Sequence, residues 1–157
     1  MLSKMIEIVI RKHLRKHIYG KKLISSKQIG FVQGLGCEVN LIRLRELALK
    51  LMKKGTVSTK FVMFIDFRQA YDSVNHEILF RKLEEMKVPG KLINSIRKML
   101  SFANMKMEVD GEVIWINRGE IQGSMLSPDL FNIYINDLIE LLEKANLNPI
   151  AYADDLA

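Results

Sequence analysis

Residues 149–157 read PIAYADDLA, an apolar run that leads straight into two adjacent aspartates, Asp154 and Asp155. A second run, FVMFID over residues 61–66, is rich in strand-forming residues and ends in Asp66. Each run predicts a short buried strand with a carboxylate at its end. Neighbouring strands of one sheet would bring these ends together, although 88 positions separate residues 66 and 154.

Carboxylates gathered in this way would form a site for hard cations. They repel one another unless a cation neutralises them, and Mg²⁺ is often held by one or two carboxylates plus substrate phosphates. Three carboxylates could hold two such ions about 3.5–4 Å apart, the geometry of phosphoryl-transferring enzymes. For Asp66 alone an ordinary turn residue is the alternative, and the double aspartate at a hairpin tip fits that alternative less well.

The rest of the chain predicts helices and one further hairpin. A helix over residues 4–19 has an apolar stripe, and a second runs from about residue 38 to 54. The first stripe is Ile6, Val9, Ile10, Leu14 and Ile18, and the second is Leu41, Leu44, Ala48 and Leu51. Helices near 75–87 and 91–102 flank the stop signal VPG, and residues 105–116 predict a hairpin around Asp110-Gly111.

The sequence SPDLFNIYINDLIELLEK, residues 127–144, predicts another helix. Ser127 is a good N-cap, Pro128 suits the first helical position, and Asp129 complements the helix dipole. Two helices, a strand, two helices, a hairpin, a helix and a final strand indicate an α+β fold, with helices packed on a small antiparallel sheet.

Charge divides the chain into two halves. Residues 1–60 hold 14 Lys+Arg and 3 Asp+Glu, a balance of +11, whereas residues 61–157 hold 10 and 15, a balance of −5, which together give the net charge of +6. The basic half is suited to a polyanion and the acidic half to cations, although lysine-rich helices can also be simply well solvated. The single cysteine, Cys37, excludes an internal disulfide. No signal peptide or membrane span is predicted, so we expect an intracellular chain.

Four motifs, which occur along the chain in the order expected for the family, resemble those of reverse transcriptases of the non-LTR retrotransposon and group II intron type. YADD (152–155), followed by an apolar residue, resembles the active-site signature. FIDFRQAYDSVNHEIL (64–79) and GEIQGSMLSPDLFNIYINDL (119–138) resemble the first two catalytic motifs, and QIGFVQGLG (28–36) resembles the fingers loop. The resemblance covers nearly the whole chain and implies the fingers and palm of a right-hand polymerase. Residues 1–60 would be a basic fingers segment and residues 61–157 a palm segment ending at YADD.

The implied activity is RNA-directed DNA polymerisation, the transfer of a nucleotide from a dNTP to a primer 3′-hydroxyl on an RNA template. Asp66, Asp154 and Asp155 would be the catalytic residues and would hold two Mg²⁺ ions, with Mn²⁺ as a substitute. The residues placed against nucleotide or template are Phe67, Tyr71, Gln122 and Gly123. Tyr71 would exclude the ribose 2′-hydroxyl, its alternative being a plain core aromatic, and Gly123 would let the backbone approach the substrate.

The sequence departs from the family pattern at the fingers loop and at its ends. Val32 and Gln33 stand where related enzymes have an arginine and a second basic residue. We expect the chain to be a fragment that lacks the thumb, so that it polymerises poorly alone and exposes an apolar surface for the thumb or another chain. Two alternatives remain: a truncated, non-catalytic RNA-binding or structural derivative, and an unrelated Mg²⁺ phosphohydrolase, which leaves the motif over residues 122–132 unexplained.

Overall fold

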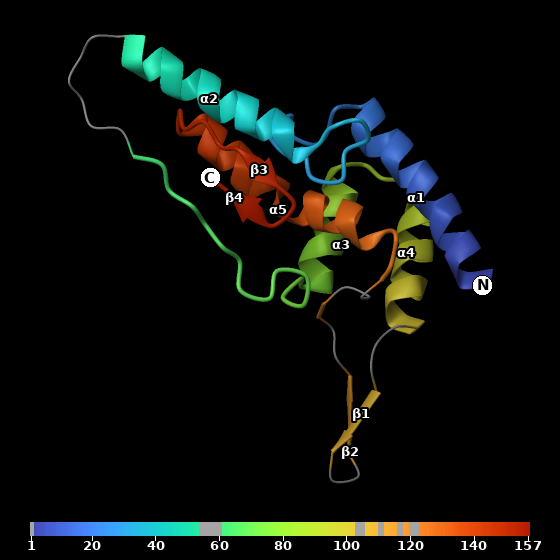
Figure 1. The fold of residues 1–157 in the computed structure, drawn as a ribbon. Helices are drawn as coiled ribbons and strands as arrows, with labels where there is room; N and C mark the ends of the chain where they lie inside the picture. Colours follow the sequence, from blue (N-terminus) through green and yellow to red (C-terminus); the bar gives the residue numbers. More distant parts are fainter. Residues whose placement is uncertain (1, 54–60, 103–105, 110–111, 116–117, 120–122) are drawn as a thin grey trace. The chain divides into compact units, whose positions relative to one another are not determined.

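The computed structural model describes residues 2–53, 61–102, 106–109, 112–115, 118–119 and 123–157. In chain order the elements are α1 (Leu2–Gly20), α2 (Cys37–Lys53), α3 (His76–Glu85), α4 (Gly90–Phe102), β1 (Lys106–Val109), β2 (Glu112–Trp115), α5 (Ser127–Lys144), β3 (Ala151–Tyr152) and β4 (Asp155–Leu156) (Figure 1). Helices with two small antiparallel strand pairs make the chain α+β, as predicted. No helix in the described part of the chain has both the length and the hydropathy to cross a membrane.

The chain divides into two compact units, each made of two chain segments. The first unit is Met1–Ile24 with Arg68–Ile135, and the second is Ser25–Phe67 with Asn136–Ala157. The aspartates of YADD and Asp66 therefore belong to the same unit, although they are far apart in sequence. The predicted division at residue 60 concerns fingers and palm function, which compactness does not test, and it stays a prediction.

In the first unit α4 packs against both α1 and α3 (Figure 1). Ile10, Leu14 and Ile18 of α1 are buried, which confirms the centre of the predicted stripe. Ile6 and Val9 were predicted in the same stripe and are 53% and 55% exposed. The buried stripe of α1 therefore follows a spacing of four residues and is narrower than the apolar pattern suggests.

Helices α3 and α4 follow the predicted boundaries because their end signals are local. The side chain of Asn75 accepts hydrogen bonds from the backbone N–H groups of Glu77 and Ile78, at 2.9 and 3.1 Å, and so caps α3. The predicted hairpin is also confirmed, since β1 and β2 pair antiparallel with Val109 opposite Glu112. Its turn, residues 110–111, lies outside the described residues.

In the second unit four short segments lie side by side as a small sheet. β3 pairs antiparallel with β4, Gln28 forms a parallel bridge with Ala151 of β3, and Ile65 forms an antiparallel bridge with Leu156 of β4. Helix α2 packs against β3, where Asn40 Nδ2 donates to the Ala151 carbonyl at 3.1 Å. The backbone of residues 28, 65 and 151–156 is thus joined into one hydrogen-bonded array.

Burial of the apolar runs in this unit differs from the sequence prediction. Residues 61–64 were predicted as a buried strand, but their exposed fractions lie between 55% and 89%, and only Ile65 of the run forms a bridge. Leu41, predicted in the stripe of α2, is 66% exposed. Apolar character indicates a tendency to be buried, but burial needs a covering layer, and the described residues supply that layer only to part of these segments.

Candidate active site

The double aspartate lies at the tip of a two-residue hairpin, as predicted. Ala151 pairs with Leu156 and Tyr152 pairs with Asp155, so Ala153 and Asp154 form the turn. Ala153 has a φ of +57°, in the left-handed region that costs a non-glycine residue about 1–2 kcal/mol. It is also only 6% exposed. The residue before the first aspartate is therefore buried and conformationally strained, a combination that persists only where surrounding contacts hold it.

Asp66 approaches this hairpin through the bridge made by the preceding residue. The backbone N–H of Ile65 donates to the Leu156 carbonyl at 2.8 Å, and the reciprocal bond is 3.4 Å. Continuing this antiparallel register by one residue places Asp66 across from Asp155. Asp154 is half-buried, whereas Asp66 and Asp155 are exposed. The structure thus brings the two predicted strand ends together at the level of the backbone.

The three carboxylates form the donor set that Mg²⁺ and Mn²⁺ prefer, since both are hard cations that favour oxygen ligands. Their side chains do not converge: no group of three or more His, Cys, Asp or Glu in the described ranges is arranged to hold a metal ion. Like charges repel, so convergence of three carboxylates is expected only around a cation. The chemistry and backbone register fit a divalent ion, and its binding stays a prediction.

Gln28 is a residue that the sequence pattern did not single out for the site. Its side chain is 2% exposed, and its Nε2 donates to the Ala153 carbonyl at 2.9 Å. Its Oε1 accepts from the N–H of Ala153 at 3.0 Å and from the N–H of Gly30 at 2.8 Å. A glutamine directly before an apolar residue and two positions before a glycine was the available signal, but its partner is 125 residues away.

The other predicted site residues lie mostly in the first unit. Tyr71 is half-buried, and its ring packs on that of Phe131 with centroids 4.7 Å apart. Gly123 has a φ of +79° and open space where a Cβ would stand, which fits a backbone that approaches a ligand. Phe67 is half-buried in the second unit, and Gln122 lies outside the described residues. The contacts of these residues with nucleotide or template stay predictions.

The beginning of α5 is held by a buried carboxylate. Asp129 is fully buried and accepts from Arg11 Nε at 2.7 Å and from the Tyr19 hydroxyl at 3.3 Å, while Arg15 Nη1 lies 3.6 Å away. Burial, and secondarily the negative charge of Asp129, raises the pKa of Tyr19 above its ordinary 10.0. Two arginines of the basic half are thus engaged inside the protein, and Asp129 does more than complement the helix dipole.

The turn before α5 is held from the same face of α1. Glu7, 9% exposed, accepts from the backbone N–H of Met125 at 3.1 Å. The Leu126 carbonyl accepts from Leu130 N at 3.1 Å, so Leu126 occupies the N-cap position and α5 begins at Ser127, one residue before the predicted first helical residue Pro128. Because Glu7 is four residues before Arg11, α1 presents one polar row to Met125 in this turn and to Asp129 at the start of α5.

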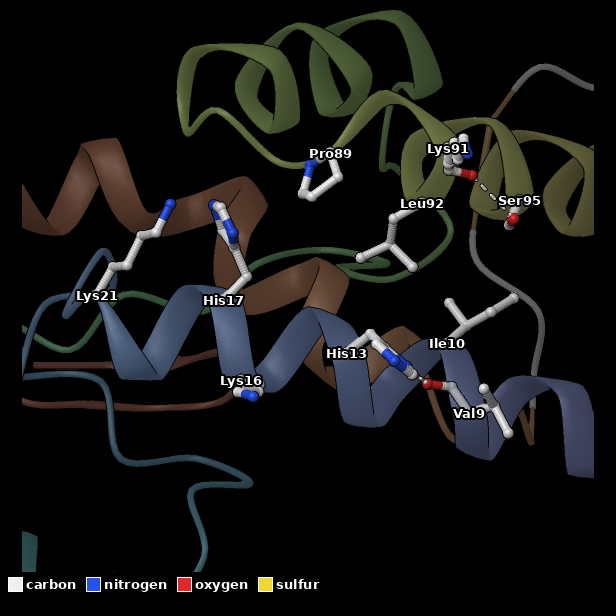
Figure 2. A pocket seen from close by; sticks show the side chains of 10 residues that line it. All are labelled: Val9, Ile10, His13, Lys16, His17, Lys21, Pro89, Lys91, Leu92 and Ser95. Atoms are coloured by element: carbon white, nitrogen blue, oxygen red, sulfur yellow. Dashed lines mark hydrogen bonds between the residues drawn. The ribbon is translucent and has the colours of Figure 1, made fainter.

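A pocket of about 560 Å³ lies on the first unit between α1 and the start of α4 (Figure 2). Val9, Ile10, Pro89 and Leu92 supply its apolar surface. Its basic residues are His13, Lys16, His17, Lys21 and Lys91, and no acidic residue lines it. His13 Nδ1 and His17 Nε2 are hydrogen-bonded to the carbonyls of Val9 and Met86, at 2.8 and 3.0 Å, which leaves the lysines as the outward cations. The pocket suits an anionic partner.

Comparison with known proteins agrees with the motifs. A family model described as reverse transcriptase (RNA-dependent DNA polymerase) matches residues 1–157. A retrovirus-related Pol polyprotein from type-1 retrotransposable element R2 of Popillia japonica is 30% identical over 135 residues, which is 77% of this chain and 22% of that protein. An RNA-directed DNA polymerase from the mobile element jockey of Drosophila funebris is 28% identical over 164 residues, 99% of this chain and 18% of that protein.

This chain spans about a fifth of the length of these curated relatives, 22% and 18% respectively. The matched region is therefore a small part of each of these relatives. The match of the family model nevertheless extends from the first residue to the last. The chain belongs to the reverse transcriptase family, as its motifs predicted.

Proposed function

We propose that the chain forms part of an RNA-directed DNA polymerase, which transfers a nucleotide from a dNTP to a primer 3′-hydroxyl on an RNA template. The observation that carries the proposal is the small sheet of the second unit, which sets Asp154 in a strained turn and aligns Asp66 with Asp155. The family membership supports the reaction class, and the jockey relative is named for that activity. Fingers and palm would be the corresponding subdomains.

In this proposal Asp66, Asp154 and Asp155 hold divalent cations. When bound, two Mg²⁺ ions would promote attack by the primer 3′-hydroxyl and neutralise the triphosphate and the departing pyrophosphate. Asp154, which is half-buried, would provide the most restrained carboxylate, whereas exposed Asp66 and Asp155 can adjust to the ions. Tyr71 would restrict the space beside the sugar, and its packing on Phe131 would keep the ring in place.

Metal binding can be measured without polymerisation. We expect the chain to bind Mn²⁺, detected by loss of the free-ion signal in electron paramagnetic resonance, and Asp154→Asn to weaken that binding. Asp137→Asn is a matched control, because it removes one carboxylate from an exposed position of α5 in the same unit. RNA-templated dNTP incorporation with Mg²⁺ should then be tested in the same three proteins after folding is verified. Mn²⁺ binding that ignores Asp154→Asn would refute the metal site.

RNA is the polyanion that the basic pocket of the first unit would contact. Lys16 and Lys91 lie on its two sides, and within the described residues neither forms an ion pair with an acidic side chain. Replacing both with glutamine should weaken single-stranded RNA binding and reduce the slope of log affinity against log salt by about 1.4. The control is Lys12→Gln with Lys98→Gln, which removes the same charge from exposed positions of α1 and α4 outside the pocket.

A second candidate is a non-catalytic RNA-binding derivative. The observation that favours it is the basic pocket of the first unit, whose lining holds five basic side chains and no acidic residue. It predicts RNA binding that depends on Lys16 and Lys91 and is indifferent to Asp154→Asn, with no incorporation by the folded chain. If the two double lysine variants lost RNA affinity equally, RNA would be attracted by the general positive charge of the chain and would not be bound specifically in the pocket.

A further inference from the structure

We infer that Gln28 is a positioning residue that clamps the Ala153–Asp154 turn and so sets where the neighbouring carboxylates stand. The inference rests on the proposed role of Asp66, Asp154 and Asp155 in binding divalent cations. Gln28 forms no hydrogen bond with any of these three side chains; it acts through the backbone of Ala153, directly before the double aspartate.

The hydrogen bonds of Gln28 match the chemistry of a primary amide. Nε2 donates to the Ala153 carbonyl, while Oε1 accepts from the N–H groups of Ala153 and Gly30. A carbonyl can only accept and an N–H can only donate, so the partners fix which way the amide points. One buried side chain thus pairs with both the N–H and the carbonyl of Ala153. A carboxylate or an apolar side chain at position 28 would leave at least one of these two backbone groups without a hydrogen bond.

The clamp acts where the backbone needs it. Ala153 holds a positive φ without the conformational freedom of glycine, and its surroundings must therefore compensate for the strain. Elsewhere in the sheet the backbone already joins the segments: Ile29 N donates to the Ala151 carbonyl at 3.1 Å, and Ala151 N donates to the Lys27 carbonyl at 3.2 Å. The bonds of Gln28 to the hairpin all fall on Ala153, so their effect is on the turn rather than on strand pairing.

The approach of Gly30 shows how closely the segment fits the turn. A Cβ at this position would collide with the backbone N of Ala153 and lie 2.8 Å from its Cα. Both contacts are with backbone atoms, which cannot rotate out of the way. Gly30 therefore lets the two backbones come close enough for a glutamine two residues earlier to reach across both polar groups of Ala153.

The clamp is testable by amide hydrogen exchange without metal or activity. In Gln28→Met, which keeps the length of the side chain, we expect exchange at Ala153 to accelerate about tenfold more than at Leu156. Ser25→Ala is the matched control, because it removes two bonds of the same segment, from Ser25 Oγ to Glu143 at 2.7 Å and from Lys27 N to Ser25 Oγ at 3.1 Å, and neither bond involves the turn. Equal acceleration at Ala153 and Leu156 in Gln28→Met would overturn the clamp and indicate general loosening of the sheet.

A second variant tests the donor and remains useful if Gln28→Met does not fold. In Gln28→Glu an ionised carboxylate can accept but cannot donate to the Ala153 carbonyl, whereas the protonated acid can do both. Protection of Ala153 relative to Leu156 should therefore return when the pH is lowered from about 8 to about 5. Asp154 and Asp155 follow the turn and also carry charge, so wild-type exchange at the same pH values is the reference. Protection that stays lost on acidification would refute the hydrogen-bonding role.

The consequence for the carboxylates is measured as Mn²⁺ affinity. Gln28→Met should weaken Mn²⁺ binding about tenfold, in the way that loss of an outer partner of a metal site does, while Ser25→Ala leaves it unchanged. Selective loss of protection at Ala153 with full Mn²⁺ affinity would overturn the positioning role. If the wild-type chain bound no Mn²⁺, the proposed function would fail, and the positioning role with it, whereas exchange at Ala153 would still decide whether the clamp exists.

Discussion

The turn that carries the double aspartate and the beginning of α5 are each held through one buried side chain whose hydrogen bonds join distant parts of the chain, but the two anchors differ in charge. Gln28 holds Ala153 with a neutral amide. Asp129 is held by Arg11 and lies near Arg15, so its anchor is ionic. Both links join segments more than a hundred residues apart, at 125 and 118 positions.

The difference in charge between the two anchors matches the different electrostatic requirements of the two regions. A charged anchor beside Asp154 and Asp155 would add to or compete with the charges that a cation must neutralise, whereas an amide holds the turn without changing the local charge. The start of α5 carries no such requirement in the proposal, so a carboxylate can serve there. Its cost is that each buried charge depends on its partner, because removal of one partner leaves the other uncompensated.

The ionic anchor should therefore give the largest loss when it is broken. Asp129→Asn keeps the shape of the side chain but removes the partner of two guanidinium groups, whose side chains are 25% and 22% exposed. We expect a loss of about 3 kcal/mol in the free energy of unfolding, at the lower end for buried pairs because the arginines keep some water. Urea unfolding followed by circular dichroism measures it.

Asp137→Asn provides the comparison, because it makes the same change at an exposed position of α5. It should alter the free energy of unfolding by less than about 0.5 kcal/mol. A similar cost for the two variants would mean that Asp129 acts only as an acidic residue of the helix. The start of α5 would then have no ionic anchor to compare with the neutral anchor at Gln28.

The neutral anchor, formed by Gln28 and Ala153, should be disrupted most strongly by a substitution at Gly30, which allows the two backbones to approach. Gly30→Ala forces a Cβ against the backbone of Ala153, and we expect a loss of about 2 kcal/mol, typical of overpacking. Gly20→Ala at the end of α1 is the control, since nothing lies within 4 Å of its added Cβ. The exchange rate of the Ile65 amide reports the loss in the second unit. Tolerance of Gly30→Ala would show that the turn can move away from Gln28.

Local signals predicted much of this fold from sequence. The VPG stop and the Asp110-Gly111 dipeptide act within a few residues, so α3, α4 and the β1–β2 hairpin are where the pattern predicted them. The hairpin at YADD was also predicted, because paired strands on either side of a short polar turn are a local pattern. The alignment of Asp66 with it followed only from the assumption that the two runs share a sheet.

Burial and long-range anchors were not predictable in the same way. An apolar run such as residues 61–64 is identical in sequence whether a layer covers it or not, and here it is exposed. The basic half was interpreted as suited to a polyanion, but Arg11 within it pairs with Asp129, which is 118 residues away and which the sequence pattern linked only to the helix dipole. The sequence does not indicate the positive φ of Ala153, because alanine rarely adopts one. Without knowledge of that strained turn, the sequence gives no reason to expect Gln28 to stabilise it.

The smallest expected effect distinguishes the anchors by pH. Tyr19 donates to Asp129 at 3.3 Å, and its pKa is raised above 10.0 by burial first and then by the nearby carboxylate. In the folded protein the phenol therefore keeps its proton at pH values where the unfolded chain has lost it. The stability that Tyr19 contributes is fully present below pH 10.0 and is lost as the pH rises through the folded-state pKa.

Tyr19→Phe should cost about 1 kcal/mol at neutral pH, through the lost hydrogen bond, and this difference from wild type should shrink as the pH rises above about 10. Urea unfolding of both proteins between about pH 7 and pH 11 measures it, and the contributions of all other groups are common to both proteins and cancel. A difference that stayed constant with pH would place the Tyr19 phenol in water rather than in the ionic anchor. The neutral clamp provides the opposite expectation: Gln28 has no proton to lose, so the contribution of its amide to the turn should be unchanged across the same range.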